Sequence, residues 1–134
     1  MNDKPTAVSD RIDTIESAYE FMLAYAAQGR RGTEGGPSEE IRGYLERLRD
    51  ALDGLAAACA SAMGEGSEGA KAFERFRPTL ERDAEETAAA VGMILAQPAI
   101  SSQMIDNLNA SVHVRTLLTD LFLIDGVLPK PGTL

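Results

Sequence analysis

The feature that most constrains this fold is a run of apolar residues at heptad spacing in the second quarter of the chain. Its members are separated by four, three, four, three, four and three residues: Ile41, Leu45, Leu48, Leu52, Leu55, Cys59 and Ala62. This spacing places every member on one side of an α-helix and is typical of helices that pack nearly parallel to a neighbour. The sequence therefore predicts a long helix that begins at Ser38 and ends at the glycine-rich segment 64–69.

Three further segments carry helical periodicity. The first follows Ser9 and ends at Gly29, and the last follows Ser101 or Ser102 and ends at Gly126. The third, 73–95, keeps its register through Pro78, and we expect a kink or break there because proline removes a backbone hydrogen bond. Four helices joined by glycine-bearing segments predict an all-α fold, an antiparallel four-helix bundle. We expect one domain at 9–127, with tails at 1–8 and 128–134.

Composition and charge exclude several classes of protein. The chain has 134 residues, a single cysteine and a net charge of −8. A field of this sign repels nucleic acids and anionic membrane surfaces, so we expect neither as a partner. No segment resembles a signal peptide or reaches the roughly 18 apolar residues of a membrane span. The sequence thus favours a cytoplasmic protein whose partner is another protein or a second copy of itself.

The sequence contains few of the residues that cofactor sites and catalytic devices require. A ferritin-like di-iron centre needs Glu-x-x-His on two helices, whereas His113 is the only histidine and is preceded by Ala110 at the required spacing. The glycine-rich segments lack the ending of a phosphate-binding loop. Cys59 lies within the heptad seam and is interpreted as a small buried apolar residue. The sequence therefore predicts no metal and no cofactor, and it favours a protein without enzymatic activity.

One helical family shares the length, acidity and single histidine of this chain. In these properties the chain resembles histidine phosphotransfer domains, which are four-helix bundles with one phosphorylated histidine. In that family a lysine and then a small residue follow the histidine at three and four positions. Here those positions are Thr116 and Leu117. The resemblance therefore concerns architecture, and it implies a phosphoryl-accepting role for His113 only as an alternative.

The first helix carries a second apolar side. Phe21 and Tyr25 fall well away from the stripe that contains Ile12, Ile15 and Tyr19. One interpretation is that another helix of the same bundle covers these two rings. The other is that they form a surface for self-association or for a partner, because exposed aromatic residues are enriched at interfaces.

The last helix is apolar around most of its circumference and contains two candidate functional residues. His113 falls on a narrow polar strip with Asp106 and Asp120, where we expect it to face solvent. Arg115 falls among apolar positions, and a guanidinium there must be paired or must reach solvent. Either its head meets a carboxylate such as Glu85 or a helix end, or it faces an interface and pairs with an acidic group of a partner or a small anion.

Together these patterns predict a non-catalytic interaction module, either a homodimer or a small accessory subunit that docks on a larger assembly. The residues expected to contact a partner are Phe21, Tyr25 and Arg115, and His113 is a further functional candidate. The alternative is a histidine phosphotransfer-like or small-anion-binding protein that uses His113 or Arg115.

Overall fold

A computed structural model describes residues 4–33 and 36–129. These residues form an all-helical fold, as predicted, and no strand occurs among them. Six helices are present in the described ranges, where the sequence predicted four. Their bounds are α1 Lys4–Ala26, α2 Gly36–Leu52, α3 Leu55–Met63, α4 Glu68–Leu95, α5 Ser102–Ala110 and α6 His113–Val127.

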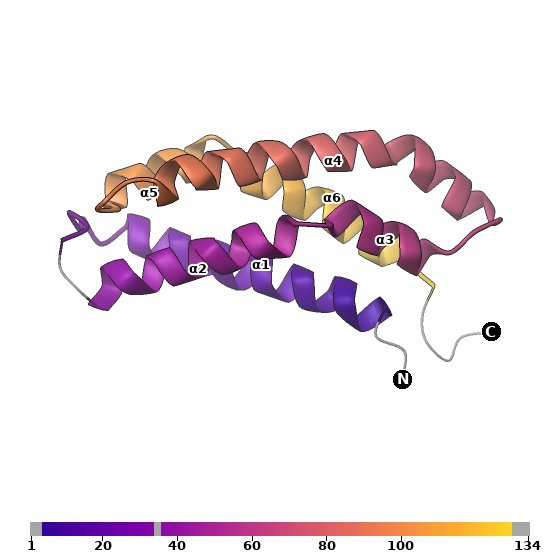
Figure 1. The fold of residues 1–134 in the computed structure, drawn as a ribbon, viewed down its shortest axis with the longest axis horizontal. Helices are drawn as coiled ribbons and strands as arrows, with labels where there is room; N and C mark the ends of the chain where they lie inside the picture. Colours follow the sequence, from indigo (N-terminus) through magenta and orange to yellow (C-terminus); the bar gives the residue numbers. More distant parts are fainter. Residues whose placement is uncertain (1–3, 34–35, 130–134) are drawn as a thin grey trace.

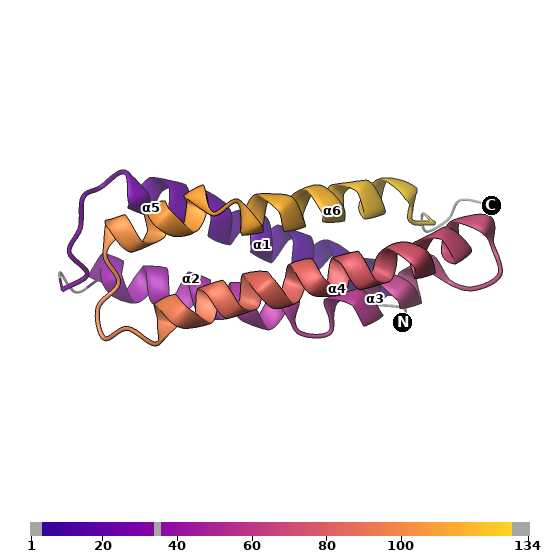
Figure 2. The same cartoon turned by 90° about the horizontal axis from the view of Figure 1, so that it is seen from above.

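The helices run along a common long axis (Figures 1 and 2). α2 and α3 follow one another end to end, and so do α5 and α6. α1 and α4 each pack against both of these pairs. Within the described residues, no helix is long and apolar enough to cross a membrane.

The predicted heptad seam forms the centre of the core. Ile41, Leu45 and Leu48 are buried in α2, and Leu55 and Cys59 are buried in α3. The seam continues from α2 into α3 although the helix is interrupted between them. Gly54 has a left-handed backbone there, with φ of 73°. The opposite wall comes from α1, where the buried positions also recur at three and four: Val8, Ile12, Ile15, Ala18, Met22 and Tyr25.

Two arginines cover the ends of neighbouring helices. Arg11 of α1 donates from Nη1 to the carbonyl oxygens of Ala51 and Asp53, at 2.9 and 2.6 Å. Arg42 of α2 donates to the carbonyls of Leu95 and Gln97, at 2.8 and 2.7 Å. The last carbonyls of a helix have no partner within the helix and sit at its negative end. Each arginine therefore stabilises a helix end and ties it to another helix.

Pro78 lies inside α4, which continues without interruption from Glu68 to Leu95. The kink or break predicted near Pro78 is not confirmed. Pro78 is on the exposed side of the helix, and buried residues such as Phe73 and Leu80 lie on either side of it. The packing of this apolar face keeps the helix continuous, although the proline removes one backbone hydrogen bond.

The interruption falls instead within the predicted last helix. Val112 separates α5 from α6 and adopts a left-handed conformation with φ of 61°. Ser101 caps α5 by accepting a hydrogen bond from the amide of Met104 at 3.1 Å. Because α5 ends at Ala110 and α6 begins at His113, the polar strip that was expected to run from Asp106 to Asp120 is split between two helices.

The chain ends differ from the expected tails. α1 begins at Lys4, within the segment predicted to be an N-terminal tail. Leu128, the first residue of the predicted C-terminal tail, is buried in the core. The remainder of the two tails, 1–3 and 130–134, lies outside the described residues.

Candidate functional site

The outer face of α6 carries a group of exposed apolar side chains. α6 buries Val114, Leu117, Leu121 and Ile124, which recur at three and four and face the other helices. On the opposite face, Phe122 is 51% exposed, Leu123 61% and Val127 60%. We call these three residues the α6 patch. Apolar side chains grouped in this way mark binding surfaces more often than isolated ones do.

The charge of this face differs from that of the whole chain. The chain carries a net charge of −8, yet none of the exposed residues of α6 is acidic. Its one exposed charge is Arg115, at the first turn of the helix. The α6 patch and Arg115 therefore form a surface that an apolar or acidic partner can approach without like-charge repulsion.

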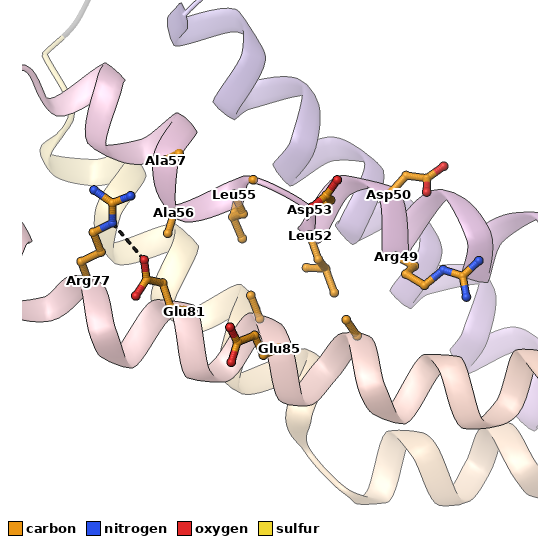
Figure 3. A pocket seen from close by; sticks show the side chains of 13 residues that line it. Arg49, Asp50, Leu52, Asp53, Leu55, Ala56, Ala57, Arg77, Glu81 and Glu85 are labelled. Carbon is orange, nitrogen blue, oxygen red and sulfur yellow. Dashed lines mark hydrogen bonds and ion pairs between the residues drawn. The ribbon is translucent and has the colours of Figure 1, made fainter.

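A cleft of about 560 Å³ lies where the junction of α2 and α3 faces α4 (Figure 3). Its floor is made of small and apolar residues, including Leu52, Ala56 and Ala84. Arg77 on its rim is held by Glu81 at 3.1 Å and by Glu74 at 3.9 Å. The lining contains no histidine, cysteine, serine or threonine, so it offers no side-chain nucleophile of these types. The remaining charged lining residues are Arg49, Asp50, Asp53 and Glu85.

The aromatic pair of α1 has partners within the chain. Tyr25 is 1% exposed, and its hydroxyl donates to the carbonyl of Ile100 at 2.6 Å. Phe21 is partly buried and stacks on Tyr44 of α2, with 4.3 Å between the ring centroids. These contacts agree with the first interpretation, in which the same chain covers the two rings.

Tyr25 also belongs to a hydrogen-bonded cluster between the end of α1 and the start of α5. Ser102 Oγ donates to the Tyr25 carbonyl at 2.5 Å and accepts from the amide of Arg30 at 2.8 Å. The amide of Ser102 donates to the Arg30 carbonyl at 2.8 Å. The glycine-bearing segment that follows Gly29 is therefore fixed at Arg30 to the start of α5.

Arg115 lies apart from the aromatic pair. It is exposed on α6, and its guanidinium makes no ion pair with any described residue. Of the contacts expected for Arg115, an ion pair with Glu85 does not form between these two described residues. The second interpretation, in which Arg115 faces an interface, stays a prediction.

His113 lies at the first position of α6 beside α4. Its side chain is 40% exposed, and Nδ1 lies 4.0 Å from Glu86 Oε1. The two groups form an ion pair only when the imidazole is protonated. The His113 carbonyl accepts a hydrogen bond from Thr87 Oγ1 at 3.3 Å. His113 thus connects the start of α6 to α4.

Two carboxyl groups of functional interest escaped the sequence reasoning. Burial raises the pKa of Asp120 to about 7, and a hydrogen bond and charge repulsion from Asp83 of α4 add to the effect. The sequence placed Asp120 on the polar strip with His113 and gave no reason to pair it with Asp83. Their proximity depends on how α4 meets α6, for which the periodicity of each separate helix carries no signal.

The exposed α6 patch was also missed. The last helix was expected to be apolar around most of its circumference, so the sequence singled out no exposed apolar side. The positions 114, 117, 121 and 124 form a complete core stripe on their own, and this spacing could have identified 122 and 123 as surplus.

Among the described residues, the single cysteine is an unreactive buried thiol and the acidic side chains form no metal centre. Cys59 is buried, and burial raises the pKa of its thiol to about 11, with a smaller opposing effect from Arg11. A thiol with so high a pKa is protonated at neutral pH and is a poor nucleophile. Residues 4–33 and 36–129 contain no group of three or more His, Cys, Asp or Glu side chains that could hold a metal ion.

Comparisons with protein-family models, with curated proteins and with solved structures find no match to this chain.

Proposed function

We propose that this chain is a non-catalytic protein-interaction module that docks on its partner through the outer face of α6. The observation that carries this proposal is the α6 patch: Phe122, Leu123 and Val127 are each more than half exposed on one face. Removal of such a patch from water favours association by roughly 25 cal/mol for each Å² of apolar area buried. A partner of this kind is another protein or a second copy of the chain.

Arg115 extends this surface toward the start of α6. Its guanidinium is exposed and makes no ion pair with a described residue, so it can meet a carboxylate of a partner. An arginine next to apolar side chains is a common combination at protein interfaces. In this proposal Arg115 contributes orientation and association rate, and the α6 patch contributes most of the affinity.

The proposal also includes the finer architecture. We propose that the six helices act as an antiparallel four-helix bundle in which α2–α3 and α5–α6 each serve as one broken helix. The outer face of α6 is then the side of the bundle that is left for a partner.

The alternative role, phosphoryl transfer at His113, has less support from the surroundings of this residue. Glu86 Oε1 lies 4.0 Å from Nδ1 of the imidazole. A phosphoryl group brought to this position would meet the negative charge of Glu86 at short range. The local charges therefore favour the interaction module.

The test is the mass of the native complex isolated from the cells that produce the protein. Leu123→Glu places a carboxylate in the α6 patch, and burying it unpaired costs about 3 kcal/mol, or roughly 100-fold in affinity. We expect the unaltered chain in a complex larger than 14.3 kDa and the Leu123→Glu chain near the mass of a monomer.

The matched control is Met93→Glu, which changes an apolar side chain that is 67% exposed on α4. This variant should keep the complex, and circular dichroism should show that both variants remain helical. The proposal fails if the unaltered chain is monomeric in those cells, or if Leu123→Glu retains the complex as fully as Met93→Glu.

A further inference from the structure

The contact between α4 and α6 contains a pair of carboxyl groups that share one environment. Oδ2 of Asp120 is shielded from solvent and has no hydrogen-bond partner among the described residues. Its neighbour across the contact is Asp83, whose carboxyl group is near enough to contribute both a hydrogen bond and charge repulsion. Two carboxylates cannot hydrogen-bond to each other, because neither has a proton to donate. A single proton shared by the pair supplies that donor.

A second polar contact between α4 and α6 joins Glu86 and His113. His113 faces Glu86, and the two attract only when His113 carries a proton. Thr87 of α4 is fully buried, and its Oγ1 donates to the carbonyl of Asp83 in the same helix and to that of His113 in α6, at 2.8 and 3.3 Å. Polar contacts therefore join α6 to α4 at both positions.

Few other charges act on the carboxyl pair. Beyond its own burial, the effects on Asp120 come from Asp83. Arg11 of α1 and Asp125 of α6 affect the pKa of Cys59 instead. Asp106 of α5 is exposed. Among the described residues, no arginine or lysine forms an ion pair with Asp83 or Asp120, so no basic side chain neutralises the pair and a shared proton can do so.

The position of α6 in the chain allows this contact to act on the whole helix. α6 is separated from α5 at Val112, whose left-handed backbone is strained for a β-branched residue. Asp120 also lies in the same helix as the α6 patch, two residues before Phe122. A change in the packing of α6 therefore also moves Phe122 and Leu123.

We propose that a proton shared between Asp83 and Asp120 locks α6 against α4, and that loss of this proton as pH rises loosens α6 and weakens binding at its outer face. Only the statement about binding rests on the proposed function. The locking of α6 is a property of the isolated chain.

The direction of the pH dependence follows from the raised pKa of Asp120. An acid whose pKa is higher in the folded state contributes stability that is fully present below its unfolded pKa of about 3.9. That contribution decreases as pH rises and is lost once the pH passes about 7. The chain should therefore hold α6 most firmly in mildly acidic solution.

The decisive experiment uses Asp120→Asn, because the amide donates the hydrogen bond that the shared proton supplies. At pH 8 we expect its melting temperature to exceed that of the unaltered chain by about 3 °C, with a difference of less than about 1 °C at pH 4.5. Asp83→Asn should give the same pattern. Asp106→Asn, which removes an exposed carboxylate from α5, should shift the melting temperature equally at both pH values.

Two measurements locate the effect. The carboxyl carbon of Asp120, followed by NMR, should titrate near pH 7, and amide protection in α6 should fall between pH 6 and 8 while that of α2 is retained. An Asp120 midpoint near 4, or equal effects of Asp120→Asn at both pH values, would overturn the proposal. If α6 loosens with pH while the native complex is unaffected, the lock stands and its link to binding is refuted; if no complex exists, the proposed function fails and the lock is still decided.

Discussion

Gly32 shows how one residue fixes the connection between two helices. Its φ of 94° lies in the left-handed region, and a Cβ placed there would lie 2.6 Å from the backbone of Ile100. Ile100 in turn accepts the hydrogen bond from the buried Tyr25 hydroxyl. The glycine therefore permits both an unusual backbone conformation and a close approach of two segments that are distant in sequence.

Replacement of Gly32 should consequently be more harmful than replacement of another left-handed glycine. Gly29 has φ of 67°, and a Cβ there would meet nothing within 4 Å. We expect Gly29→Ala to lower the free energy of unfolding by about 1 kcal/mol, the cost of left-handed geometry alone. Gly32→Ala should lower it by at least about 2 kcal/mol, because a backbone clash is added. Urea denaturation of both variants measures the difference, and equal losses would show that the close approach to Ile100 does not hold in solution.

At the scale of the helices, Pro78 and Val112 show what local sequence signals can and cannot predict. Pro78 is a strong signal for a break, yet α4 continues through it because its apolar face packs on both sides. Val112 carries no such signal, since valine is among the residues least suited to a left-handed backbone. The break before α6 is therefore imposed by tertiary packing and could not be predicted from periodicity.

The strain at Val112 predicts a stabilising substitution. Asparagine adopts left-handed geometry more readily than valine and is a favourable residue at the N-cap of a helix. Val112 is already 40% exposed, so little packing is lost on replacement. Val112→Asn should raise the free energy of unfolding by about 1 kcal/mol, as measured by urea denaturation.

Val127→Asn serves as the control for this substitution, because Val127 is exposed on the same helix and has no left-handed backbone. It should change the isolated chain by less than about 0.5 kcal/mol. A loss of stability in Val112→Asn would mean that Val112 is not strained.

For the whole molecule, the sequence predicted the helical class and the members of the α2–α3 seam, because burial on one side of a helix leaves a direct trace in residue spacing. The proposed binding surface left no comparable trace. Whether Phe122 or Leu121 faces outward depends on which helices cover α6, and the shielding of Asp120 depends on Asp83 of α4. Tyr25 was a candidate for partner binding for the same reason: its cover, Ile100, is distant in sequence.

The distribution of charge is the second property that emerges only for the whole molecule. A chain with a net charge of −8 resists association wherever acidic residues are exposed. None of the exposed residues of α6 is acidic, and its two aspartates, Asp120 and Asp125, are partly buried, so association meets less repulsion here than on strongly acidic surfaces. This combination of apolar exposure and missing negative charge is the basis for assigning the interaction to α6.

The most direct test of that assignment is site-specific photo-crosslinking in the cells that produce the protein. A photoreactive phenylalanine analogue is placed at Phe122, and in parallel at Met93, which is exposed on α4. We predict that the chain labelled at 122 yields one discrete crosslinked species, at twice the mass of the chain if the partner is a second copy and at another defined mass if it is a different protein. The chain labelled at 93 should yield no such species. Absence of a discrete crosslink from 122, or the same crosslinked species from both positions, would contradict the assignment of the binding surface to α6.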